Sequence, residues 1–97
     1  MGIYHYNAMK YRSKNGIFAS ILSSAVGDDG IRITKIMYNS FLSYSQVTYY
    51  LTLLRENGTL YYDEMARVYK TTEKGHKFLE LYNGMGELLK VKLTIDG

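Results

Sequence analysis

The chain has 97 residues, of which 46% are hydrophobic and 22% charged, with a formal net charge of +3 and no cysteine. This length supports one domain, and the composition is that of a folded protein rather than a disordered one. No apolar run approaches the roughly 20 residues that span a bilayer, and the first residues lack the apolar block of a signal peptide. Without cysteine there is no disulfide framework. We therefore expect a single domain, residues 1–97, in the cytoplasm.

Positive charge is concentrated in the first part of the chain. Residues 1–55 contain six Lys and Arg residues against two Asp residues, a net charge of +4, whereas residues 56–97 carry −1. A basic part joined to a roughly neutral part suits a polyanion bound on one side of the molecule. An asymmetry of this size also arises by chance, so it indicates a polyanionic partner only together with other evidence.

Two helices are predicted before residue 40. The stretch "KNGIFASILSSAVG" places Ile17, Ile21 and Leu22 on one helical face, and Gly27 is a plausible stop. In the following stretch, "GIRITKIMYNSF", Thr34 is positioned to cap a short helix that runs through Asn39.

Residues 43–57 give a stronger helix signal. Ser43 is followed three residues later by Gln46, as a capping box requires. Apolar residues then recur at the spacing of one buried helical face: Val47, Tyr50, Leu51 and Leu54. The outward positions of this helix carry Ser, Gln, Thr and Tyr, where a surface helix usually carries Lys and Glu.

After Asn57-Gly58 the pattern becomes extended. Residues 59–62 and 67–71 are expected to form a hairpin, and Thr72 with Glu73 opens a last helix. Apolar residues at three- and four-residue steps carry that helix to about Lys90. Residues 89–96 also alternate strictly between apolar and polar, which is a strand pattern, so helix and strand both remain open there.

The order of these elements is helix, helix, turn, helix, hairpin and helix. This is the order of a winged helix-turn-helix, an α+β fold that is mostly α, with residues 39–42 as the turn. We expect a core of residues 14–71, which includes a two-stranded wing at residues 59–71. Residues 72–92 are then a C-terminal dimerisation helix.

Two stretches also resemble a known family. "TKIMYNSFLSYSQVTYYLTLL" contains the pattern T-[KR]-I-M-Y-x-x-x-L-S-Y, and "YKTTEKGHKFLELY" contains [YL]-x-[LIT]-T-x-K-G. Over roughly residues 14–82 the chain is similar to the small archaeal winged-helix DNA-binding proteins, including the chromatin-associated crenarchaeal dimers and related transcriptional regulators. The resemblance implies a homodimer that binds double-stranded DNA, in the cytoplasm of an archaeal cell or of the host of an archaeal virus or plasmid.

The chain departs from this family in two places. Relatives often carry Lys or Arg on the exposed face of the recognition helix, where this chain has Thr48, Tyr49 and Thr52. The long C-terminal coiled coil of the family is shorter here and is interrupted by Gly84 and Gly86. These departures bear on affinity and on dimer geometry more than on the fold.

The recognition helix of such a protein, here residues 43–57, lies in the major groove, where its N-terminal residues meet base edges. Gln can pair with adenine, and Ser or Thr can serve any base. Cations elsewhere would bind phosphates and dominate affinity, although ordinary surface charge and a merely solvated helix remain alternatives. The predicted DNA-binding residues are Ser43, Tyr44, Ser45, Gln46, Thr48, Tyr49 and Thr52 on the helix, with Arg12, Lys14, Arg32, Lys35, Arg67 and Lys70 around it.

Tyrosine is unusually frequent, with eleven residues in the chain. We expect Tyr38, Tyr44 and Tyr50 to fill core or cap positions with the hydroxyl at the surface. Stacking on unpaired bases is the alternative, since aromatic faces bind single strands.

No pattern in the sequence indicates an enzyme. His5 and His76 are far apart and lack supporting Cys or paired carboxylates, so no metal site is expected. Neither a Gly-rich phosphate loop nor a nucleophile motif occurs. We expect no catalytic residue, no metal and no cofactor.

The apolar seam of the last helix is the expected homodimer interface, because it would be costly to expose in a monomer. Its residues are Phe78, Leu81, Tyr82, Met85, Leu88 and Leu89. The predicted function is double-stranded DNA binding by a homodimer, as a transcriptional regulator or a DNA-compacting protein. The competing class is a protein-interaction module that uses the same scaffold without binding DNA.

Overall fold

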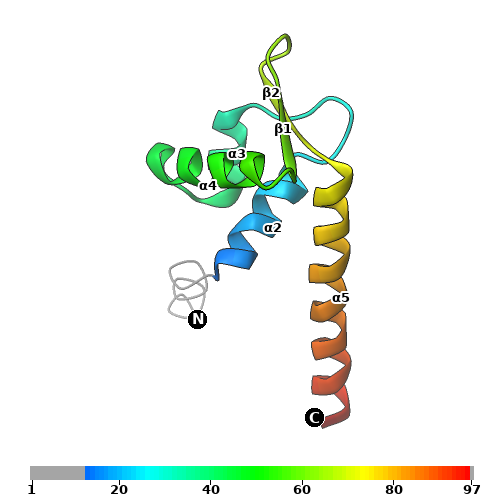
Figure 1. Ribbon diagram of the computed structural model, residues 1–97. Helices are drawn as coiled ribbons and strands as arrows, with labels where there is room; N and C mark the ends of the chain where they lie inside the picture. Colours follow the sequence, from blue (N-terminus) through cyan, green and yellow to red (C-terminus); the bar gives the residue numbers. More distant parts are fainter. Residues whose placement is uncertain (1–12, 97) are drawn as a thin grey trace.

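The computed structural model describes residues 13–96, with side-chain detail through residue 84. In this range the elements are α2 (Lys14–Ser24), α3 (Ile33–Ser40), α4 (Tyr44–Glu56), β1 (Leu60–Asp63), β2 (Val68–Thr71) and α5 (Glu73–Asp96). Helices α2, α3 and α4 pack together, the hairpin β1–β2 projects from one end, and α5 runs down the side of the domain (Figure 1). The predicted winged helix-turn-helix is confirmed.

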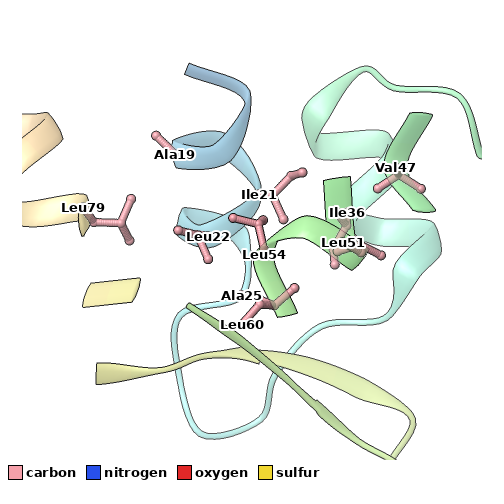
Figure 2. Close-up of a cluster of buried hydrophobic side chains, with 10 residues drawn as sticks. All are labelled: Ala19, Ile21, Leu22, Ala25, Ile36, Val47, Leu51, Leu54, Leu60 and Leu79. Atoms are coloured by element: carbon pink, nitrogen blue, oxygen red, sulfur yellow. The ribbon is translucent and has the colours of Figure 1, made fainter. Parts of the chain in front are cut away.

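One apolar core joins the four helices to the hairpin. Ile21 and Leu22 of α2 and Ile36 of α3 are fully buried, and Leu79 attaches α5 to the same cluster. The predicted stripe of α4 also faces inward, since Val47, Leu51 and Leu54 are at most 2% exposed, while Tyr50 packs half-buried against them. Figure 2 shows ten of these side chains converging between α2, α4 and the hairpin. Burial of this one cluster fixes which face of each helix points outward.

The start of α3 differs from the prediction. Arg32 is its N-cap residue and makes no side-chain capping hydrogen bond, so Thr34 lies within the first turn and does not cap the helix. The prediction of Thr34 as the cap was wrong because the chain enters α3 from a short bridge at Ile31, which sets the start of the helix earlier. At its other end α3 extends to Ser40, one residue beyond the predicted Asn39, and Phe41 closes it in a left-handed conformation with φ 58°.

The capping box of α4 is confirmed. The Gln46 backbone N–H donates to Ser43 Oγ at 3.2 Å, and the Ser43 backbone N–H donates to Gln46 Oε1 at 2.9 Å. These two bonds satisfy groups that a helix N-terminus would otherwise leave open. They also commit the Gln46 side chain to a structural position.

The hairpin is tied to α3 by backbone hydrogen bonds. Its antiparallel register pairs Tyr62 with Tyr69. Ile31, just before α3, forms an isolated bridge with Tyr69, in which each N–H donates to the other's carbonyl, at 2.9 and 2.7 Å. At the hairpin turn, Asp63 Oδ1 accepts from the N–H groups of Met65 and Ala66. The sequence predicted both strands to within one residue, but not this third strand-like contact.

Two of the three tyrosines expected in core or cap positions are exposed and cap no helix. Tyr38 is 80% and Tyr44 62% exposed, so the prediction was wrong for both. Ile36 and Ser40 take the inward positions of α3, which leaves Tyr38 on the opposite face, and Tyr44 is the first residue of α4, ahead of its buried stripe. Tyr50 is half-buried as predicted, and its ring meets Phe18 edge-on at 5.8 Å.

Helix α5 runs without a break from Glu73 to Asp96, so residues 89–96 are helical and do not form a strand. Thr72 precedes it as predicted, and its Oγ1 accepts from the Gly75 N–H at 3.2 Å. A Cβ at Gly75 would collide with the Thr59 carbonyl oxygen and with the Thr71 side chain. Glycine is therefore needed where α5 crosses the end of α4 and the start of β1. Within residues 13–96, no helix is both long and apolar enough to cross a membrane.

Replacing Gly75 with alanine should destabilise the fold, because one of the colliding atoms belongs to the backbone and cannot swing aside. We expect Gly75→Ala to lower the free energy of unfolding by about 1–3 kcal/mol. Gly84→Ala is the matched control, since a Cβ there meets nothing within 4 Å and alanine favours a helix by up to about 1 kcal/mol. Urea denaturation followed by circular dichroism measures both. Equal stability of the two variants would contradict the proposed packing of α5.

Candidate nucleic-acid interface

Two threonine hydroxyls on the outward face of α4 use their hydrogen atoms within the helix. Thr48 Oγ1 donates to the Ser45 carbonyl, and Thr52 Oγ1 donates to the Thr48 carbonyl, both at 2.9 Å. Ser45 and Thr52 are exposed, Thr48 is half-buried, and Tyr49 is 55% exposed. In this conformation the threonines offer lone pairs to a ligand but no free donor.

Gln46 lies on a different flank of α4 from the residues that face the hairpin. It is nine residues from Arg55, about two and a half turns at 3.6 residues per turn, so the two side chains leave opposite sides of the helix. The Arg55 guanidinium lies over the Tyr62 ring of β1, 5.5 Å from its centroid. Gln46 therefore points away from the hairpin, and its carbonyl oxygen is held in the capping box. Its amide NH2 and the second lone pair of its carbonyl oxygen are left for a base.

A recess of about 340 Å³ lies where α3, α4 and the hairpin meet. We call it the arginine–tyrosine recess. It brings together three predicted site residues from separate segments, Arg32, Tyr44 and Arg67. Among the described residues the lining is Arg32, Ile33, Thr34, Tyr44, Tyr62, Arg67 and Tyr69. None of these residues is a carboxylate, so the recess suits an anion.

Two hairpin tyrosines form one wall of the arginine–tyrosine recess. The rings of Tyr62 and Tyr69 lie 4.7 Å apart, centroid to centroid, and Arg55 approaches Tyr62 from α4. Partial burial raises the pKa of the Tyr69 hydroxyl; Arg55 opposes the shift, and Tyr62 and Tyr44 add to it. The hydroxyl therefore stays protonated at neutral pH and remains a hydrogen-bond donor.

Lys35 and Lys70 do not line this recess. Lys35 lies with Thr34 and Tyr38 along an open groove on α3. Lys70 lines a different recess, with Asp28 and His76, and its Nζ is 3.5 Å from Asp63 Oδ2. Alternation along the strands explains the separation, because Lys70 and Tyr69 are adjacent in β2 and point to opposite faces of the hairpin.

Of the two N-terminal cations, the structure describes only Lys14, which is apart from the hairpin. Lys14 is the first residue of α2 and is exposed. That end of α2 lies at the opposite end of the domain from the hairpin tip (Figure 1). Arg12 lies outside the described residues.

Three residues that approach this site were missed in the sequence: Arg55, Tyr62 and Tyr69. Tyr62 and Tyr69 are opposite each other in the hairpin register, and strand alternation could have placed them on one face. Arg55 follows Tyr44 by three helical turns, which puts both on the same side of α4. Neither sequence pattern predicts that the side of α4 with Tyr44 and Arg55 faces the hairpin.

The predicted dimer residues divide along α5. Leu81 is 72% and Tyr82 37% exposed, whereas Phe78 packs against the core and stacks on Tyr82, with ring centroids 6.1 Å apart. The side chains of Met85, Leu88 and Leu89 lie outside the described detail. An apolar surface is therefore open where α5 leaves the domain.

Within residues 13–84, whose side chains the structure describes, no three His, Cys, Asp or Glu residues come together in a group that could hold a metal ion. His76 is exposed at the start of α5, and His5 lies outside the described residues.

Comparison with known proteins identifies the family. The model of the winged helix-turn-helix family matches residues 11–90. The chain belongs to the winged helix-turn-helix family. Among solved structures, this winged-helix chain is similar to Sso10a-2, a DNA-binding protein from Sulfolobus solfataricus, with a TM-score of 0.65 and 25% sequence identity over 88% of this chain and 94% of that one. No curated protein matches it. The predicted resemblance to archaeal winged-helix DNA-binding proteins is confirmed.

The capping box at the start of α4 should be measurable as stability. We expect Ser43→Ala to lower the free energy of unfolding by about 1 kcal/mol, because the Gln46 N–H loses its acceptor. Ser23→Ala is the control, since Ser23 is an exposed serine of α2, and its effect should stay within about 0.5 kcal/mol. Ser45 is unsuitable, because its hydroxyl is hydrogen-bonded to that of Ser43. Urea denaturation measures both variants, and a loss at Ser23 as large as at Ser43 would argue against the box.

Proposed function

We propose that this protein binds double-stranded DNA, with α4 in the major groove and the hairpin on the sugar–phosphate backbone. The observation that carries the proposal is the convergence of Arg32 and Arg67 beside the first residue of α4, in a recess to which the described part of the chain contributes no carboxylate. Within the described residues neither guanidinium has an ion-pair partner. Membership of the winged helix-turn-helix family and similarity to a DNA-binding protein support the same function.

Binding should depend weakly on sequence, which favours DNA compaction over operator-specific regulation. Base discrimination needs donors and acceptors directed at base edges. Thr48 and Thr52 direct their hydroxyl hydrogens into their own helix, and Gln46 is held by Ser43. Phosphate contacts, which carry no sequence information directly, are left as the main source of affinity. A DNA partner would place the protein in the cytoplasm of an archaeal cell or of the host of an archaeal virus or plasmid.

We further propose that two copies pair through α5. Leu81 is largely exposed on a helix that extends well past the rest of the domain (Figure 1). Pairing would cover this apolar surface and present two copies of α4 to one duplex.

A protein-interaction module remains the competing function. Tyr38 and Phe41 expose 80% and 66% of their surface near the helix-turn-helix turn, and exposed aromatic side chains are common at protein interfaces. This function predicts no binding to a duplex at low salt, so the two proposals are separated by one titration.

The titration compares wild type with Arg67→Ala on several duplexes of unrelated sequence. Wild-type affinity should fall with salt by a log–log slope of several units. We expect Arg67→Ala to weaken binding by about tenfold on every duplex, since a charge-assisted phosphate contact is lost. Lys77→Ala, an exposed cation on α5 outside the recess, should have little effect. Fluorescence anisotropy gives the dissociation constants.

Two results would reject DNA binding through this surface. One is the absence of duplex binding by wild type at about 50 mM salt. The other is an Arg67→Ala variant that binds every duplex as tightly as wild type. A large difference in wild-type affinity between duplexes would instead reject the sequence-neutral part of the proposal.

Charge at Leu81 should separate the two copies. We expect Leu81→Glu to convert a dimer into a monomer in sedimentation equilibrium, because each interface would then have to bury a carboxylate. Glu80→Gln changes the neighbouring exposed position and should leave the dimer intact. A wild-type chain that sediments as a monomer, or an unaffected Leu81→Glu dimer, would rule out pairing at this part of α5.

A further inference from the structure

We propose that Arg32 and Arg67 hold the same DNA phosphate, so that the arginine–tyrosine recess is a single clamp closed from two sides. This inference rests on the proposed DNA binding and adds that the two arginines contact one phosphate rather than two. Independent surface cations would each meet a different phosphate. A clamp requires both guanidiniums to be fixed relative to each other and directed at one place.

The backbone fixes their relative position. The bridge between Ile31 and Tyr69 is antiparallel, with hydrogen bonds of 2.9 and 2.7 Å in the two directions. Arg32 follows Ile31 directly, and Arg67 lies two residues before Tyr69. The bridge therefore brings the backbones of the two arginines into one region, although 35 positions separate them in the chain, and both residues line the recess. A backbone arrangement that is set before binding need not be ordered when a ligand arrives.

The turn of the hairpin fixes Arg67 further. Its backbone is left-handed, with φ 59°, and its N–H donates to the Asp63 carbonyl at 2.7 Å. The Asp63 carboxylate accepts from Met65 and Ala66 and pairs with Lys70. The Asp63 carboxylate thus has its own partners, and neither Asp63 nor Glu64 of the turn lines the recess. The described lining therefore contains two cations and no anion.

The remaining lining selects a phosphate with its attached sugars. Tyr44, Tyr62 and Tyr69 add hydroxyl groups to the two guanidiniums, and hydroxyl donors commonly contact the DNA backbone. A volume of about 340 Å³ exceeds what a bare phosphate ion fills, so the recess leaves room for the neighbouring sugars. Since Tyr44 is the first residue of α4, a phosphate held here sets how far that helix enters the groove.

A double-mutant cycle on the full chain tests the shared phosphate. Arg32→Ala, Arg67→Ala and the double variant are measured against one duplex at fixed low salt. A phosphate held from two sides loses most of its binding when either side is removed, so each single variant should lose about tenfold. The double variant should lose little more than either single variant, and its salt slope should fall by about one unit in total.

Separate phosphates predict a different result. The losses would then multiply to about a hundredfold, and the salt slope would fall by about two units. That outcome would overturn the clamp while leaving DNA binding intact, whereas a wild-type chain that binds no duplex would overturn the proposed function itself. The pair Arg32→Ala and Lys77→Ala is the control, and its effects should multiply.

Two further measurements control for backbone strain at Arg67 and for binding of free phosphate. Arg67→Asn replaces Arg67→Ala in a second cycle, because asparagine tolerates a left-handed backbone better than alanine, and the coupling should be the same. Inorganic phosphate is then titrated into the DNA-free protein and followed by the amide signals of residues 31–34 and 67–69. Weak binding that competes with the duplex fits the clamp. Saturation of the recess by phosphate without any loss of duplex affinity would make it a free-anion site and reject the clamp.

Discussion

The reciprocal backbone contact between Ile31 and Tyr69 is the constraint on which the proposed DNA-binding surface depends. A two-stranded hairpin alone is marginally stable in water, and its orientation relative to the helices would otherwise depend on side-chain packing. The bridge ties it to the segment that enters α3. Arg32, Tyr44 and Arg67 then line the same recess although they belong to three separate segments. Their side chains are exposed, so it is the backbone beneath them that positions the charge.

The composition of α4 has a consequence for specificity. Short polar side chains keep the helix slender, and their hydrogen bonds to preceding carbonyls keep them close to its surface. A slender helix can enter a groove without displacing much water, yet with the hydroxyl hydrogens of Thr48 and Thr52 turned inward it has fewer donors for base edges. The same residues therefore favour insertion of α4 into the groove and disfavour discrimination between base sequences. In this interpretation affinity comes from cations outside α4, and α4 contributes shape.

Helices and strands could be predicted from the sequence because their signals are local. The capping box of Ser43 and Gln46, the buried stripe of α4 and both hairpin strands required only spacing rules. The site was predicted less completely. Lys70 was grouped with Arg67 because both are in the hairpin, but alternation places Lys70 on the far face beside Asp63. Arg55 and Tyr62 meet only through tertiary packing, and no local pattern contains that contact.

The distribution of charge bears on why the protein would act as a pair. Of the six cations proposed to contact DNA, one lies outside the described residues, one begins α2 far from the hairpin, and one is paired with Asp63 (Figure 1). A protomer that directs so few cations at one backbone should bind weakly, because each phosphate contact adds a limited amount of counterion release. Linking two such surfaces through α5 would make the second contact intramolecular. The fraction of DNA sites occupied then rises, because the second copy is held at a high effective concentration near the duplex. Neither copy needs more positive charge for this gain.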